Sequence, residues 1–305
     1  MRPAPAAGAL AVALAVHGCG GAPPPPPLGS LTLAHRGFTE SRLIAEAYAQ
    51  SLRDEGFAVR ITDLVGDADG PTMVRLGRLD AYVDYDGSVY LTQLDNPAPT
   101  RRVPPTTLWR AVSEGLAVRG VTAMPPAPFS NSNQVACTTA ATRRWGIADM
   151  PSLARAAPHL TYAANREHLT RRDGLPLLRR AYGIRFGSVV MVPVDGRYAP
   201  ITDGRAQCVY AFSTDPQLAT LPLALVRDDA GRFAGTVDFR PFLAVSTVAL
   251  HRMRAPARAA LDRAVSRVTS HLTLGHMREL NSEVDLDGRP AQDVARAFVA
   301  SLQSD

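Results

Sequence analysis

The sequence predicts an α/β protein with two lobes. Short apolar, strand-like runs alternate with helical segments in the first part of the folded chain. This alternation is the signature of helices packed on a mostly parallel sheet. The alternation starts again after about residue 130, beyond a proline-rich break. The chain has 305 residues, of which 46% are hydrophobic and 20% charged, a composition that allows a substantial core.

The first series of elements begins with a strand over residues 31–34. A helix of about 15 residues follows, with Thr39 as its predicted N-cap and apolar side chains at i, i+4 spacing. This helix is predicted to end at Glu55-Gly56. The remaining elements of this series are strands over 58–61 and 79–85, helices over 71–76 and 108–117, and an apolar run over 121–124.

The second series is predicted as strands over 133–138, 160–163, 189–194 and 207–212 and helices over 150–157 and 176–182. The last third is predicted to be helical, with an apolar stripe from Ala257 to Leu272 and a final helix that has Pro290 in its first turn. Ligands of such folds bind at helix N-termini and strand carboxyl ends. We therefore expect a ligand site between the lobes.

The N-terminal segment predicts export. The apolar run over residues 6–16 is shorter than the roughly 20 residues of a membrane span and has the length of a signal-peptide core. The residues up to Cys19 (Val-His-Gly-Cys) resemble the lipobox of bacterial lipoproteins, in which the cysteine is lipidated. We expect a signal peptide over 1–18, and a lipidated Cys19 with a stiff proline-rich spacer over 19–30. This places the protein outside the cytoplasm, anchored to the cell membrane. The alternative is an ordinary signal peptide with an incidental cysteine.

Two further cysteines, Cys137 and Cys208, lie in strand-like runs. In an exported protein they are candidates for a disulfide, and the alternative is a pair of buried free thiols. We expect no metal site, because the sequence has no Cys-x-x-Cys and its seven histidines do not cluster with ligand spacing. No cofactor is expected either.

The charge pattern and the motifs argue against nucleic-acid binding and catalysis. All 33 basic residues are arginine, and they are scattered along the chain rather than concentrated in one patch. The absence of lysine excludes Schiff-base chemistry and a phosphate-loop lysine. No nucleophile elbow, His-Glu-x-x-His or dinucleotide motif is present. We therefore expect neither a nucleic-acid partner nor an enzyme.

Aromatic, arginine and small polar residues gather at the ends of predicted elements, in four short segments. These segments are Arg36–Glu40, Tyr82–Ser88, Arg171–Pro176 and Val209–Asp215. In their order and spacing they resemble the substrate-binding proteins of ABC importers for glycine betaine, carnitine and choline. The resemblance runs from about Leu31 to the C-terminus.

The resemblance rests on short matches to the family's motifs. In chain order the matching segments are Phe38-Thr39-Glu40, Asp84–Ser88, Arg171–Leu175, Tyr182-Gly183, Phe212–Asp215, Met277–Asn281 and Val284–Gly288. The family implies a type II periplasmic-binding-protein fold, in which two lobes are joined by a two-stranded hinge around a central ligand cleft. Lobe one is expected over 31–129 plus 216–305 and lobe two over 130–215.

On this expected fold the chain crosses between the lobes near Asn133 and Phe212. Cys137 and Cys208 then lie on neighbouring strands close behind the hinge, which favours a disulfide. The resemblance also implies a monomer that closes around its ligand and docks on an ABC permease.

The resemblance implies a quaternary ammonium ligand. A trimethylammonium group cannot donate an ordinary hydrogen bond, so aromatic faces hold it by cation–π attraction. By position, the residues implied to contact the ligand are Tyr85 and Phe212 as cage walls, Tyr198 as a third wall, Ser88 and Arg171 as polar contacts, Arg36 near the cleft, and Asn133.

Three departures from the family pattern point away from glycine betaine itself. Asn133 stands where the family has a tyrosine, Phe212 lacks a tyrosine hydroxyl, and Asp86 replaces a threonine and would add a negative charge by the cleft. The ligand choices are therefore glycine betaine, a larger or more polar betaine, carnitine, choline or ergothioneine. Two other functions stay open, a lipid-anchored sensor or interaction protein with a degenerate cleft and an enzyme on the same fold.

Overall fold

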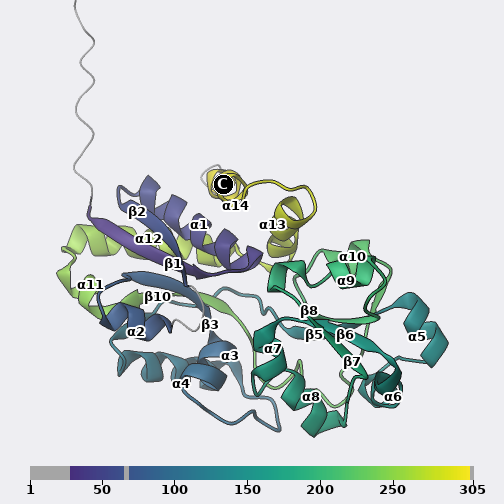
Figure 1. The fold of residues 1–305 in the computed structure, drawn as a ribbon. Coiled ribbons are helices and arrows are strands. Elements are labelled where there is room, and N and C mark those ends of the chain that lie inside the picture. The colour runs from purple at the N-terminus through teal and green to yellow at the C-terminus, as the bar shows by residue number, and fades with distance from the viewer. Residues whose placement is uncertain (1–27, 65–68, 303–305) are drawn as a thin grey trace, which may run out of the picture.

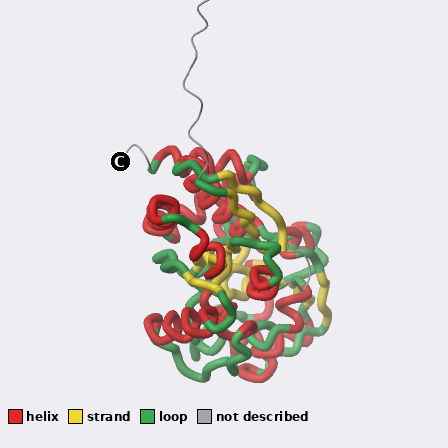
Figure 2. The backbone as a smooth tube through the Cα atoms, turned by 90° about the vertical axis from the view of Figure 1, so that its left-hand side faces the viewer, coloured by secondary structure: helices red, strands yellow, loops and turns green. Residues whose placement is uncertain are grey.

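The computed structural model describes residues 28–64 and 69–302. Two five-stranded sheets form the two lobes, and helices cover both faces of each sheet (Figures 1 and 2). The predicted signal peptide, Cys19 and the spacer up to residue 27 lie outside the described residues. Within the described ranges, no helix has the length and apolar character needed to cross a bilayer.

The first sheet has the strand order β2-β1-β3-β10-β4. Its strands are β1 (Ser30–Arg36), β2 (Ala58–Leu64), β3 (Ala81–Tyr85), β4 (Val121–Ala123) and β10 (Pro241–Ser246). Strand β1 pairs in parallel with β2 and β3, whereas β10 runs antiparallel to β3 and β4. The carboxyl ends of β1 and β3 therefore meet at one edge of the sheet, where Arg36 and Tyr85 lie.

Helices pack on both faces of the first sheet and bury two separate apolar cores. They are α1 (Thr39–Asp54), α2 (Gly70–Arg75), α3 (Asp86–Ser88), the π-helical turn Val89–Gln93, α4 (Pro105–Ala117), α11 (Thr247–Arg252), α12 (Ala255–His271), α13 (Leu274–Asp285) and α14 (Ala291–Ser301). Helix α1 packs against β1 and β2 and against the C-terminal helices α12 and α14, which fix its position beside the sheet (Figure 1).

The second sheet has the order β7-β6-β8-β5-β9. Its strands are β5 (Asn133–Thr138), β6 (Thr161–Ala164), β7 (Ser188–Met191), β8 (Cys208–Phe212) and β9 (Leu223–Leu225). Its helices are α5 (Thr139–Trp145), α6 (Met150–Ala156), α7 (Arg166–Thr170), α8 (Leu175–Tyr182), α9 (Ala199–Thr202), α10 (Gln217–Thr220) and the 3₁₀ turns Ala157–His159 and Val194–Gly196. Strand β5 pairs antiparallel with both β8 and β9.

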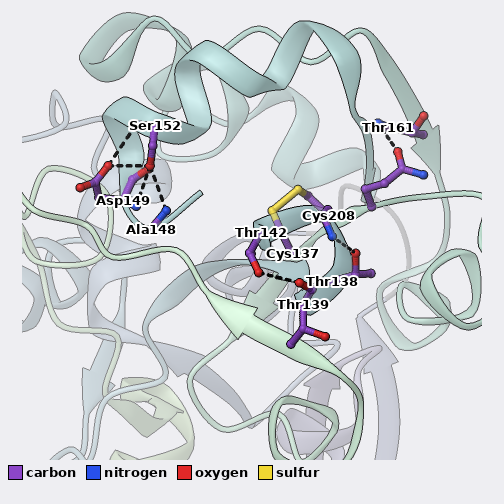
Figure 3. The surroundings of a disulfide bond; sticks show 11 residues. Cys137, Thr138, Thr139, Thr142, Ala148, Asp149, Ser152, Thr161 and Cys208 are labelled. Atoms are coloured by element: carbon purple, nitrogen blue, oxygen red, sulfur yellow. Dashed lines mark hydrogen bonds between the residues drawn. A yellow bond between two sulfur atoms is a disulfide. The ribbon is translucent and has the colours of Figure 1, made fainter. Parts of the chain in front are cut away.

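Cys137 and Cys208 form a disulfide between β5 and β8 (Figure 3). The two residues stand directly opposite each other in the strand register, with their Cα atoms 4.0 Å apart, and both are fully buried. The predicted disulfide is thus confirmed, and the alternative of two free thiols is wrong.

The chain passes between the lobes through two hydrogen-bonded segments. Residues 130–132 carry it into the second lobe, and the backbone N–H of Asn131 donates to the carbonyl of Phe239 on the returning segment at 2.9 Å. The sequence predicts the return crossing near Phe212, but the chain returns to the first lobe later than that. Strand β9 still pairs with β5, and Phe233 packs in the second core, so the boundary expected at 216 is too early. A three-residue edge strand carries too little periodicity to be recognised in the sequence.

Three smaller expectations also need correction. Thr39 is the first residue of α1 rather than its N-cap; Phe38 holds that position with an extended φ of −130° and no side-chain cap bond. Pro290 is the N-cap of α14 rather than a first-turn residue. Strand β10 lies in a region predicted to be helical. All six of its residues are buried, so its sequence shows no alternation that would separate a strand from a buried helix.

Candidate ligand-binding site

A cavity of about 730 Å³ lies between the two lobes. Its wall combines the carboxyl ends of β1, β3 and β8 with the start of α1, helix α7 and residues 191–194. Asn131 and Phe239 of the two crossing segments close its back. The cavity therefore forms where strand ends from both sheets converge, which is the place at which open α/β sheets bind ligands.

Most of the predicted site residues line this cavity. The six that do are Arg36, Tyr85, Ser88, Asn133, Arg171 and Phe212. Tyr198 does not reach it. Its ring packs with Val209 and Ala211, and its hydroxyl donates to Asp215 at 2.6 Å. Because side chains alternate across a strand, the face of β8 that carries Val209 and Ala211 points away from Phe212 and the cavity. Tyr198 therefore lies outside the lining of this cavity.

A continuous aromatic wall runs across the cavity from one lobe to the other. Phe38 lies 5.9 Å from Tyr85 in the first lobe and 5.8 Å from Phe212 in the second, measured between ring centroids. Tyr210 meets Phe212 edge-on at 5.0 Å and stacks on His168 at 3.8 Å. Both lobes thus supply rings to one surface.

Three members of this wall were not assigned from the sequence. Phe38 was part of a matched motif, but it received no role. Tyr210 precedes Phe212 by two residues on β8, so the strand alternation alone indicates that both side chains share a face. His168 gives no such signal, because it lies in the five-residue helix α7 and reaches the cavity only through the packing of the second lobe.

Asn133 holds Tyr210 in place instead of adding a ring of its own. The Tyr210 hydroxyl donates to Asn133 Oδ1 at 2.6 Å, and both residues are buried. The neighbouring His168 is also buried, and burial lowers its pKa to about 3, so the imidazole is neutral. The Tyr162 hydroxyl contacts its Nε2 atom at 3.0 Å. His168 and Tyr210 therefore add aromatic and polar but uncharged groups to this end of the cavity.

Two arginine–aspartate pairs lie on opposite sides of the cavity. In the first lobe, Arg36 donates a hydrogen bond to Asp84 at 2.9 Å. In the second lobe, Arg171 donates two hydrogen bonds to Asp173, at 2.9 and 2.7 Å. Asp84 raises the pKa of Arg36, and the positive charge of Arg171 opposes that rise. The two guanidinium groups are therefore close enough to interact electrostatically. Each keeps nitrogens that make no hydrogen bond to another described residue, and these donors suit a ligand carboxylate.

A buried ion pair fixes the orientation of Phe212. Arg197 donates to both carboxylate oxygens of Asp215 at 2.5 Å, and its guanidinium carbon lies 4.8 Å from the Phe212 ring centroid. Asp215 also accepts the Phe212 backbone N–H at 2.7 Å. Because the Arg197 guanidinium covers one face of the Phe212 ring, a ligand can contact only the opposite face or the edge of this ring.

Asp86 does not add charge to the cleft, contrary to expectation. It is fully buried, does not line the cavity and pairs with Arg240 at 2.7 Å. Burial raises its pKa to about 6. Within the described residues, no cluster of three histidine, cysteine or acidic side chains is arranged to hold a metal ion.

Comparison with known proteins identifies the family of this two-lobed chain. The profile of the substrate-binding domain of ABC-type glycine betaine transport systems matches residues 29–301. The chain belongs to this family. Its members are the binding components of transporters for betaine-like compounds, act outside the cytoplasm and pair with a permease.

Solved structures agree with this family at the level of the fold. A glycine betaine/carnitine/choline ABC transporter protein superimposes with a TM-score of 0.68 at 17% identity, covering 90% of this chain and 98% of the other. A choline-binding protein in complex with choline gives 0.62 at 13% identity over 90% and 89%. Lactococcal OpuAC closed on glycine betaine gives 0.60 at 12% identity over 90% and 97%. The type II periplasmic-binding-protein fold predicted from the sequence is confirmed.

A curated relative is similar in sequence as well. The ergothioneine transport permease/ergothioneine binding protein EgtU of Helicobacter pylori (strain G27) is 23% identical over 236 residues. The match covers 76% of this chain and 40% of the relative, so the chain spans about two fifths of that protein's length.

Proposed function

We propose that this protein is the lipid-anchored, extracytoplasmic binding component of an ABC importer, and that it binds a quaternary ammonium compound between its lobes without catalysing a reaction. The observation that supports the proposal best is the aromatic wall to which both lobes contribute. Its Phe38–Phe212 contact at 5.8 Å joins one lobe to the other at the cavity. The lipid anchor rests on the sequence around Cys19.

The wall and the arginine pairs match the two ends of a betaine. Aromatic faces attract a trimethylammonium group by about 0.5–2 kcal/mol per contact, and more strongly when water is excluded. The unpaired N–H groups of Arg36 and Arg171 suit a carboxylate placed between them. Tyr85, Phe38 and Tyr210 are the proposed ring contacts, and Ser88 is a proposed polar contact.

The size and lining of the cavity favour a betaine larger than glycine betaine. A volume of about 730 Å³ lies well within the range of sites that hold drug-sized ligands. Beyond the aromatic wall it is lined by Asn165, Glu167 and His168, which offer hydrogen-bond acceptors to a second polar group. The name of the Helicobacter relative adds ergothioneine as the leading candidate. Choline, carnitine and glycine betaine are the alternatives within this class.

Binding is proposed to work by closure of the lobes. Arg172 of the second lobe contacts Asp95 of the first at 2.9 Å, and both side chains are mainly exposed. A ligand that touches Tyr85 in one lobe and Arg171 in the other stabilises the closed form. The closed form then presents both lobes to the permease.

A thermal-shift screen tests the proposed ligand class. The soluble domain without residues 1–19 is heated with betaines, choline, carnitine, ergothioneine and unrelated amino acids. A ligand present at 100 times its Kd stabilises the folded protein by about 2.7 kcal/mol, which shifts Tm by several degrees. We expect a shift only with quaternary ammonium compounds. No shift with any of them contradicts the proposal and favours a sensor with a degenerate cleft.

A further inference from the structure

One buried carboxylate near the cavity differs from all the others. Within the described residues, each of the buried aspartates has an arginine partner: Asp84 with Arg36, Asp86 with Arg240, Asp173 with Arg171 and Asp215 with Arg197. Glu40 is 3% exposed and forms no ion pair with any described residue. A buried carboxylate without a counter-charge is costly to ionise, so a cation bound near Glu40 would stabilise its charged form.

The contacts of Glu40 connect it directly to the aromatic wall. Its Oε1 atom accepts the Tyr85 hydroxyl and the Asn131 side-chain amide, both at 2.8 Å. Its Oε2 atom faces the Asn281 amide of α13 at 3.4 Å. Tyr85 is the wall residue of β3, and Asn131 belongs to a crossing segment. Glu40 therefore lies immediately behind the ring that faces the ligand, at the point where the lobes join.

Hydrogen-bond donors surround the Glu40 carboxylate and partly offset the effect of its burial. Burial raises its pKa, whereas hydrogen bonds from Thr214, Tyr85, Asn131 and Asn281 lower it. Both asparagines turn their amide N–H groups toward the carboxylate and leave their Oδ1 atoms buried without a partner. Glu40 also lies in the first turn of the 16-residue helix α1, where the helix dipole stabilises an anion.

We propose that Glu40 is a specificity-determining residue, which supplies the negative counter-charge for the quaternary ammonium group of the ligand through the ring of Tyr85. A hydrogen bond from a tyrosine hydroxyl to a carboxylate increases the electron density of the ring and so strengthens its attraction for a cation. The carboxylate adds a direct Coulomb attraction, which a site with little water screens weakly. This inference rests on the proposed ligand class and assigns the residue that makes the site prefer a cation.

The role is tested by comparing quaternary ammonium compounds with carbon isosteres that lack the nitrogen charge. Choline is paired with 3,3-dimethylbutan-1-ol and glycine betaine with 3,3-dimethylbutanoate, which have nearly the same shape without the nitrogen charge. Binding of both pairs is measured by calorimetry for the wild type, Glu40→Gln and Tyr85→Phe. Glutamine keeps an oxygen for Tyr85 and Asn131, and its amide can donate to the unpartnered Asn281 Oδ1. Glu114→Gln, on the exposed face of α4, is the matched control.

We expect Glu40→Gln to bind the cation about tenfold more weakly, equivalent to ~1.4 kcal/mol, while the affinity for the isostere changes less than about twofold. Tyr85→Phe keeps the ring but removes the hydroxyl that bonds to Glu40, so it should lose part of the preference for the quaternary ammonium compound over its isostere. This variant tests the role even if Glu40→Gln does not fold. Glu114→Gln should match the wild type. Equal losses for cation and isostere, or unchanged cation binding by either variant, overturn the role of Glu40. A wild type that binds none of the quaternary ammonium compounds overturns the proposed ligand class as well.

Discussion

At the residue scale, Tyr85 connects the ligand cavity to the interior of the first lobe. Its side chain is buried at 5% exposure, its hydroxyl is bound to Glu40, and its ring lies beside Phe38. The buried acceptor and the strand end together fix the position of the ring. A contact that is fixed before the ligand arrives costs little conformational entropy on binding.

Replacement of Tyr85 by alanine should therefore weaken binding of a quaternary ammonium ligand by roughly 1–3 kcal/mol, the scale of a desolvated cation–π contact plus packing. Calorimetry on the soluble domain measures the loss. Trp145→Ala, which removes an aromatic side chain on α5 outside the cavity, is the control and should bind as the wild type. An unchanged Kd for Tyr85→Ala contradicts the contact.

Glu40 should also make stability depend on pH. Because its folded-state pKa is raised, the folded protein binds a proton more readily than the unfolded chain, so Glu40 destabilises the ligand-free protein more as the pH rises. Of the side chains that contact it, only Tyr85 titrates, and burial raises that pKa well above 10. Glu40→Gln should therefore melt at a higher temperature than the ligand-free wild type at neutral pH, and the difference should shrink on acidification. A lower Tm for the variant at neutral pH contradicts an uncompensated buried charge.

At the scale of elements, strands β5 and β8 support the second-lobe half of the site. They carry Asn133, Tyr210 and Phe212 at the cavity, and the Cys137–Cys208 disulfide joins them at the opposite end of their pairing. The bond closes a loop with a sequence separation of 71 residues. Chain-entropy arguments give such a cross-link a stabilisation of about 4 kcal/mol.

The double variant Cys137→Ala/Cys208→Ala should lower the free energy of unfolding by about 2–4 kcal/mol in urea titrations. Reducing agent should destabilise the wild type by a similar amount and leave the double variant unchanged. Identical unfolding curves for the oxidised wild type and the double variant would show that the disulfide does not stabilise this lobe.

The elements also show which features the sequence predicts well. Strand β5 has the predicted bounds, 133–138, because a polar start and a threonine end frame an apolar run. Strand β10 was missed because complete burial removes the alternation that marks a strand. Tyr198 was placed at the cavity by analogy with the family, but the alternation along β8 and the packing of α9 put it on the opposite face. Contacts that depend on tertiary packing, such as those of His168 and Glu40, leave no signature in the local sequence.

At the scale of the whole molecule, the site exists only where the two lobes meet. Phe38 and Tyr85 come from the first lobe, Tyr210 and Phe212 from the second, and Asn131 from the crossing segment. A ligand that contacts all of them couples its binding to the relative position of the lobes. Transport by the permease can then depend on whether the cavity is filled.

The proton NMR spectrum of a bound quaternary ammonium ligand tests the central claim most directly. The compound with the largest thermal shift is added to the soluble domain, and the resonance of its N-methyl groups is followed. Aromatic rings shift the protons that lie over their faces upfield, so we predict an upfield methyl resonance with nuclear Overhauser contacts to the rings of Tyr85 and Phe38, reduced in Tyr85→Ala. A bound ligand whose methyl protons show neither the shift nor contacts to aromatic protons would contradict the aromatic site between the lobes.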